Sequence, residues 1–194
     1  MEGNKKTIAT VVAVVAIVLL GLLGIVALGE SNSGPEADDT NNAAQETPKG
    51  DCEISECMKK LEPKMTIEEA NKIMGFDGEK SADSDQYTWQ LTSKSKIVVE
   101  YKDQLGTFTA TYDKDQIKDP SFKISKGYEL QGLLQDGTSY TYEETVKQFD
   151  GVEGYLAVKS PTSKMYMWVN SDGMTFRATF SDSLNGKTSI ISIR

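Results

Sequence analysis

The feature that most constrains this fold is a helix-start pattern that occurs twice in the chain. Thr66 is followed by Glu69 three positions later, and Thr141 is followed in the same way by Glu144. In a Thr-x-x-Glu capping box, the threonine hydroxyl and the glutamate carboxylate each satisfy a free backbone amide at the helix start. Apolar residues follow both copies at helical spacing. Each copy therefore predicts the start of an amphipathic helix.

A strand pattern is repeated as well. Tyr87-x-Trp89 corresponds to Tyr166-x-Trp168, and both lie in segments rich in aromatic and β-branched residues, which favour strands. The separation between the two tryptophans equals the separation between Tyr101 and Phe180, the last aromatic residues of the strands that follow. This constant offset predicts that the two segments are built alike.

A short apolar stripe precedes each capping box and predicts one more helix per copy. The stripe consists of Ile54, Cys57, Met58 and Leu61 in the first copy, and of Leu130, Leu133 and Leu134 in the second. The last strands alternate apolar and polar residues, which is typical of a sheet with one buried and one wet face. The predicted class is α+β, with two tandem helix-helix-antiparallel sheet repeats, residues 52–118 (the first half) and 119–194 (the second half). We expect one continuous sheet with helices on one face.

At these residues the chain resembles the family of the secreted β-lactamase inhibitory protein. The landmarks are Met65–Glu69, Gly75, Tyr87-x-Trp89 and Lys96–Tyr101 in the first half, and Thr141–Glu144, Gly151, Tyr166-x-Trp168 and Thr175–Phe180 in the second. The resemblance covers approximately residues 53–194. It implies two repeats that join their sheets side by side, and a concave face rich in exposed aromatics. In the namesake inhibitor that face wraps a protruding loop of an enzyme, so the analogy favours a binding module.

The candidate partner-binding residues are Tyr87, Trp89, Tyr166 and Trp168. Strand residues two apart point to the same side of a sheet, so each Tyr-Trp pair shares one face. If that face is open, the four rings form an aromatic platform of the kind that anchors protein interfaces. If it faces the helices, they are core residues. The sequence leaves both interpretations open.

An apolar segment near the N-terminus predicts where the protein is located. Residues 7–29 carry no charge, and a helix of that length at about 1.5 Å per residue spans a hydrocarbon layer of about 30 Å. Lysines precede the segment and acidic residues follow it, which keeps residues 1–6 in the cytoplasm. We expect a single-pass cell-membrane protein whose C-terminal domain is extracellular. Cleavage after the small residues Ala27 and Gly29 is the alternative and would release a secreted protein.

Residues 30–51 combine Asn, Ser, Pro, Gly and acids with almost no large apolar side chain. Such a segment buries too little apolar area to offset its ordering entropy. We therefore predict a disordered acidic linker between the membrane segment and the folded part.

Composition excludes several classes of function. The formal net charge of −8 makes nucleic acid an unsuitable partner, because an acidic surface repels phosphates. The chain has no histidine, which excludes serine-histidine triads and histidine-zinc sites. Ser93-x-x-Lys96 has the spacing of penicillin-interacting enzymes but lacks their companion motifs. We predict no catalytic residues, no cofactor and no metal.

Cys52 and Cys57 are the two cysteines of the chain. Outside the cytoplasm such a pair can be oxidised. Residues five apart on one continuous helix are too distant for a disulfide, so a bridge requires Cys52 to precede the helix that contains Cys57. A disulfide and two free thiols both remain open.

The leading functional prediction is a non-enzymatic, membrane-anchored binding module outside the cytoplasm. Its sheet face would bind a protein or a cell-envelope ligand. One alternative is a structural or assembly component of a bacterial cell-envelope complex. Another is an inhibitor of a β-lactamase or of a different wall-active hydrolase.

Overall fold

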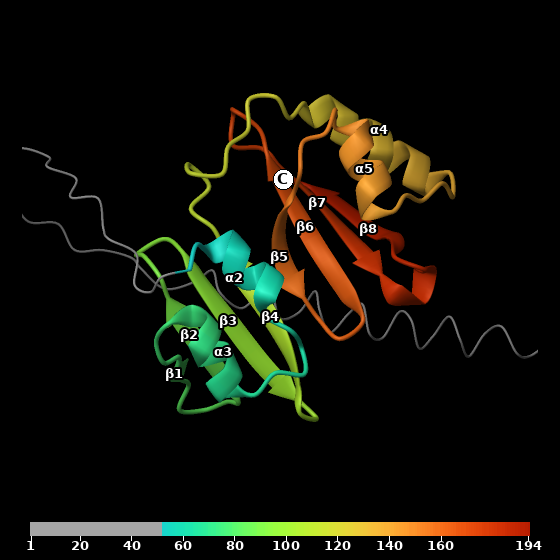
Figure 1. The fold of residues 1–194 in the computed structure, drawn as a ribbon. Helices are drawn as coiled ribbons and strands as arrows, with labels where there is room; N and C mark the ends of the chain where they lie inside the picture. The colour runs from blue at the N-terminus through green and yellow to red at the C-terminus, as the bar shows by residue number, and fades with distance from the viewer. Residues whose placement is uncertain (1–51) are drawn as a thin grey trace, which may run out of the picture. The chain divides into compact units, whose positions relative to one another are not determined.

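The structure, a computed structural model, describes residues 52–194, which belong to one compact unit (Figure 1). The predicted cytoplasmic N-terminus (1–6), transmembrane segment (7–29) and linker (30–51) lie outside the described residues. Between residues 52 and 194, no helix has the length and apolar character needed to cross a membrane.

Each half contains two helices followed by four strands. The first half consists of α2 (Ile54–Lys60), α3 (Ile67–Met74), β1 (Glu79–Lys80), β2 (Gln86–Gln90), β3 (Lys96–Lys102) and β4 (Leu105–Thr111). The second consists of α4 (Ile124–Gln135), α5 (Tyr142–Gln148), β5 (Tyr155–Lys159), β6 (Ser163–Val169), β7 (Thr175–Ser181), a 3-10 turn (Asp182–Leu184) and β8 (Lys187–Ile193). The eight strands form one antiparallel sheet in the order β1 to β8. The predicted α+β class is confirmed.

Strand register repeats between the halves. Trp89 on β2 lies opposite Ile97 on β3, and Trp168 on β6 lies opposite Phe176 on β7. The sequence separation from Trp89 to Trp168 is the same as that from Ile97 to Phe176, so both members of the pair are displaced equally. Side chains in these positions therefore have equivalent neighbours in both halves.

Both predicted capping boxes are present. The Glu69 amide donates to the Thr66 hydroxyl at 3.3 Å, and the Thr66 amide donates to the Glu69 carboxylate at 2.9 Å. The corresponding distances at Thr141 and Glu144 are 3.2 Å and 2.8 Å. The boxes satisfy the same free amides at the starts of α3 and α5, as the sequence predicted.

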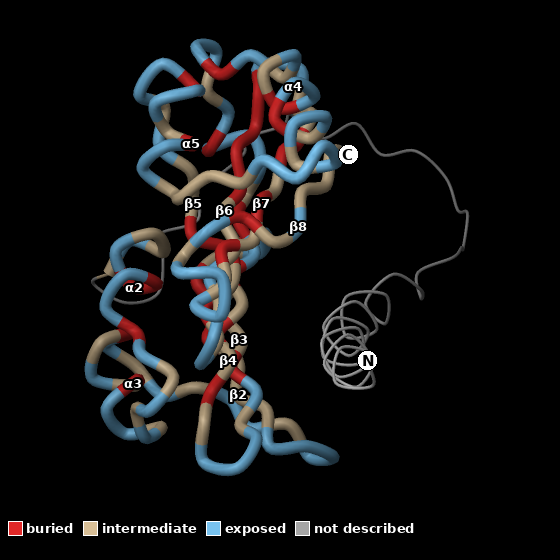
Figure 2. Tube along the Cα trace, turned by 90° about the vertical axis from the view of Figure 1, so that its right-hand side faces the viewer, coloured by how far each residue is buried: buried red, intermediate tan, exposed pale blue. Residues whose placement is uncertain are grey.

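In the first half, the helices cover the sheet face on which Trp89 lies. The indole Nε1 of Trp89 donates to the side-chain oxygen of Asn71 on α3 at 3.0 Å. Apolar residues of α2, including Cys57 and Met58, share one core cluster with Trp89 and with Phe108 of β4. Figure 2 shows α2 and α3 on one side of β2, β3 and β4.

In the second half, the helices cover the corresponding face. Phe149, the residue at the C-terminus of α5, packs against Trp168 and Phe176 with ring centroids 5.2 Å and 5.1 Å apart. Gly127 of α4 lies directly against Phe176, where a Cβ would come within 2.6 Å of the ring. All four described helices thus lie on the face that carries both tryptophans, which we call the helix face.

Each tryptophan packs against a glycine that lies directly before the neighbouring strand, β1 for Trp89 and β5 for Trp168. A Cβ on Gly78 would lie 2.7 Å from the Trp89 ring, and a Cβ on Gly154 would lie 2.7 Å from the Trp168 ring. Only a glycine allows this close approach. The shared packing of indole on glycine is a second similarity between the halves.

Cys52 and Cys57 form a disulfide with their Cα atoms 5.7 Å apart. Cys52 precedes α2 and Cys57 lies within it, which is the arrangement that the spacing required. The disulfide interpretation is therefore the one that the structure supports.

The predicted stripe on α4 is wrong at Leu133, which is 39% exposed. The helix packs through Ile124, Gly127 and Leu130, and Leu133 lies about 120° away from the centre of that stripe at about 100° per residue. Gly127 replaces a large side chain in this contact, so an apolar pattern alone did not reveal which side of α4 is buried.

Candidate functional site

The two tryptophans do not line an open surface. Trp89 is 0% exposed and Trp168 is 1% exposed, both beneath helices. Their indole N–H groups have internal acceptors, Asn71 for Trp89 and the Val152 carbonyl at 2.9 Å for Trp168. The platform interpretation is therefore wrong for both tryptophans, because the largest apolar side chains occupy the covered face of a one-sided sheet.

The two tyrosines of the candidate set share the helix face but not one surface. Tyr87 packs edge-on against Tyr101 with centroids 6.3 Å apart. Tyr166 stacks on Tyr142 of α5 with centroids 4.0 Å apart. Both candidates are half-buried. Their role in binding a partner remains a prediction, and the four aromatic residues do not form one platform.

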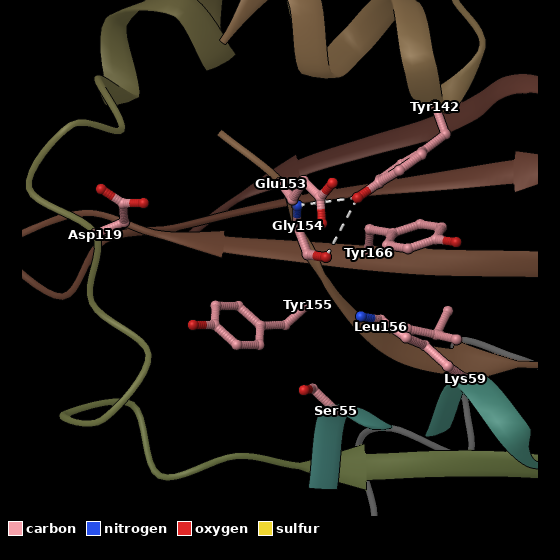
Figure 3. A pocket seen from close by; sticks show the side chains of 9 residues that line it. All are labelled: Ser55, Lys59, Asp119, Tyr142, Glu153, Gly154, Tyr155, Leu156 and Tyr166. Atoms are coloured by element: carbon pink, nitrogen blue, oxygen red, sulfur yellow. Dashed lines mark hydrogen bonds between the residues drawn. The ribbon is translucent and has the colours of Figure 1, made fainter. Parts of the chain in front are cut away.

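Tyr166 lines a pocket of about 410 Å³ between the two halves, on the helix face (Figure 3). The other lining residues are Ser55 and Lys59 of α2, Asp119 of the connection, Tyr142 of α5, Glu153, Gly154, and Tyr155 and Leu156 of β5. The Tyr142 hydroxyl accepts from the Gly154 amide at 3.2 Å.

Burial controls the ionisation of the pocket tyrosines. Burial raises the pKa of Tyr142 to about 12, and it also raises the pKa of Tyr155 and Tyr166. The phenols therefore stay neutral near pH 7, where they serve as hydrogen-bonding groups and not as bases.

On the opposite side, which we call the open face, one row of side chains crosses the sheet. Because strand residues alternate between faces, these positions alternate with the helix-face positions. Directly paired residues on β2 to β8 make up the row: Thr88, Val98, Thr109, Val158, Met165, Thr179 and Ile190. We call it the uncharged row. Six members are half-buried and Ile190 is exposed. The described helices pack on the opposite face, with Trp89 and Trp168. Met167, Val169 and Thr175, which alternation places on the open face outside this row, are buried.

Charge on the open face differs from that of the whole chain. Strands β5 to β8 contain no aspartate or glutamate. On β7, Arg177 alternates with Phe176 and Ala178 of the helix face, so it lies on the open face. The second half of this face is therefore cationic although the protein carries a net charge of −8.

Metal ligands are not gathered in the described part of the chain. Residues 52–194 contain no cluster of three His, Cys, Asp or Glu side chains with the geometry to hold a metal ion.

Comparison with known proteins finds no family model that matches this chain and no matching curated protein. The resemblance to the β-lactamase inhibitory family therefore remains a prediction.

Sequence reasoning missed the uncharged row and Arg177. The available signal was strand alternation, which places Arg177 on the other side of the sheet from its apolar neighbours Phe176 and Ala178. The row itself depends on register across seven strands, and no single segment reveals it.

Proposed function

We propose that residues 52–194 are a non-enzymatic binding module in which two copies of one packing unit share a sheet. Residues 7–29 anchor this module to the cell membrane, and it works outside the cytoplasm. Its partner is a protein that docks on the open face. The helix-face tyrosines, in contrast, mainly stabilise the core.

The observation that supports this proposal is the uncovered, uncharged row. Seven strands at a spacing of about 4.8 Å make the row about 29 Å long, and strands of seven residues are about 24 Å long. Such a face is close in size to one side of a standard protein interface, about 800 Å². The row combines threonines with the apolar Val98, Val158, Met165 and Ile190, and exposed apolar side chains rimmed by polar ones are typical of interaction sites.

Rigidity also favours docking here. Every member of the row lies on a strand that is hydrogen-bonded to its neighbours, and the opposite face is held by packed helices. A preorganised surface loses less conformational entropy on binding than a loop does.

Site-specific photo-cross-linking in the cell that makes the protein tests the proposal. A photo-reactive residue replaces Thr109 in the full-length chain, and the matched control has it at Leu133, an exposed residue of α4 on the helix side. We expect a discrete protein adduct from position 109 and none from position 133. A Thr179→Asp change, which puts a charge into the row, should abolish the adduct, whereas Leu133→Asp should not. Equal adducts from both positions, or none from position 109 in a stably expressed chain, would contradict the proposal.

A further inference from the structure

The chain contains only two arginines, Arg177 and Arg194, and the fold brings them together. Thr175 and Arg194 exchange two backbone hydrogen bonds, of 2.7 Å and 2.9 Å, so they lie directly opposite each other. Arg177 lies opposite Ser192, two positions before Arg194. The arginines are therefore diagonal neighbours on the open face, within reach of each other's long side chains.

Neither guanidinium has a carboxylate partner in the described part of the chain. The six ion pairs among residues 52–194 all use lysines, namely Lys59, Lys80, Lys94, Lys118, Lys126 and Lys159. This is unexpected in a chain with 29 acidic and 21 basic residues. Arginine is also the better ion-pair former of the two, because its planar fork matches a carboxylate.

Two buried polar atoms at this place, one of them in Arg177 itself, lack hydrogen-bond partners as well. The Nε atom of Arg177 is buried and has no acceptor among the described residues, and the same holds for the hydroxyl of Thr175, which is 1% exposed. Burial and, second, the nearby Arg194 lower the pKa of Arg177. Two like charges and an unsatisfied donor are costly in a half-buried place, and a bound anion would relieve both costs.

We propose that Arg177 and Arg194 form an anion site that receives a carboxylate of the docking protein. This inference deepens the proposed function, because it rests on docking at the open face and specifies the partner's chemistry. Two guanidinium forks offer several N–H donors to the two oxygens of one carboxylate.

The position of the pair within the face narrows the partner further. Arg177 is two positions from Thr179 of the uncharged row, a separation of about 7 Å along a strand. The matching protein surface therefore presents an aspartate or glutamate next to a small apolar patch. Charge complementarity supports this partner, because no acid on β5 to β8 competes for the arginines.

The first test is NMR of the full-length chain in lipid nanodiscs, observing the Arg177 Nε–H signal. Succinate serves as the carboxylate probe and inorganic phosphate as the competing probe. We expect succinate to shift the signal, and we expect the shift to be lost in Arg194→Gln but kept in Lys102→Gln, a control on the first half of the open face. Absence of a succinate effect, or a shift caused by phosphate alone, would overturn the carboxylate assignment.

The second test uses the cross-link from position 109. Arg177→Gln should reduce the adduct about tenfold or more, since loss of one member of an interfacial charge pair weakens binding strongly. Arg177→Lys should give an intermediate yield because it keeps the charge and loses the fork. An adduct that is unaffected by Arg177→Gln and Arg194→Gln, in variants with native NMR spectra, would overturn the inference while leaving open-face docking intact. If the chain that keeps both arginines gives no adduct from position 109, the docking proposal fails. The succinate titration then still decides whether the anion site exists.

Discussion

The two halves have the same backbone arrangement but different core side chains. Register, capping boxes and the packing of indole on glycine are the same in both. The first core is mainly aliphatic, whereas the second is a cluster of aromatic rings around Trp168 and Phe176. Helix α2 has 7 residues and a disulfide, and α4 has 12 residues and a glycine contact. Backbone pairing is thus the shared element, and the side chains that fill the space around it are free to differ.

The open face differs between the halves in a way that matters for binding. The first half has charges of both signs on β3, Lys96, Glu100 and Lys102, at positions that alternate with the buried Ile97 and Val99. The second half has cations without a carboxylate on its strands. A face that is mixed at one end and cationic at the other gives a partner a defined orientation.

The largest effect should come from removing either tryptophan. We expect Trp89→Ala and Trp168→Ala each to lower the free energy of unfolding by about 3–5 kcal/mol, as for other buried large-to-small changes. Urea unfolding of the full-length chain measures both. Similar losses of unfolding free energy would show that the two tryptophans stabilise their halves to the same extent. A loss below about 1 kcal/mol at one site would show that the halves are not equivalent.

Glycine substitutions should have the next largest effect. A Cβ on Gly78 or Gly154 would collide with an indole ring, so Gly78→Ala and Gly154→Ala should each destabilise by about 1–3 kcal/mol. Gly132 on α4 is the matched control, because a Cβ there meets no atom within 4 Å. Gly132→Ala should stabilise by about 0.5–1 kcal/mol through helix propensity. Destabilisation by all three changes to the same extent would disprove a specific contact between glycine and tryptophan.

Helix α2 gives a prediction specific to the first half. Replacing both Cys52 and Cys57 by Ser removes a small closed loop and should cost about 2 kcal/mol in the chain-entropy model. Amide hydrogen exchange should then become faster in α2 and stay unchanged in α4. Faster exchange in both helices would mean that the two halves unfold as one unit.

Alkaline unfolding tests the burial of a tyrosine in the second half, and burial also raises the pKa of Tyr112 in the first half. The pKa of Tyr142 in the second half is raised to about 12 by burial, whereas a tyrosine in an unfolded chain titrates near pH 10. The folded chain therefore keeps a proton that the unfolded chain has lost, and stability should fall as the pH rises from about 10 to about 12. Tyr142→Phe should make this decline shallower, and Tyr128→Phe, at a ring that is 52% exposed, serves as the control. An unchanged slope in Tyr142→Phe would contradict a buried phenol.

Local chemistry explains what the sequence could predict. The capping boxes at Thr66 and Thr141 depend on near neighbours in the chain, and the sequence indicated both. For the disulfide of Cys52 and Cys57, the sequence indicated the geometric condition but left its formation open. The side on which Trp89 lies was undecided, because alternation shows which residues share a face but not which face the helices cover. The pocket at Tyr166 and the arginine pair require contacts across the sheet. Arg177 and Arg194 are distant in sequence, so only the pairing of β7 with β8 brings them together.

The central claim is that helices cover one face of the sheet while the other is available to a partner. Methyl NMR of the full-length chain with a neutral, soluble gadolinium agent tests this claim most directly. Val98 of the uncharged row and Val99 of the helix face are adjacent on β3 and form a matched pair. We predict strong relaxation of the Val98 and Val158 methyls and weak relaxation of the Val99 methyls. Equal protection of Val98 and Val99 would mean that the supposed open face is covered, and it would contradict the account.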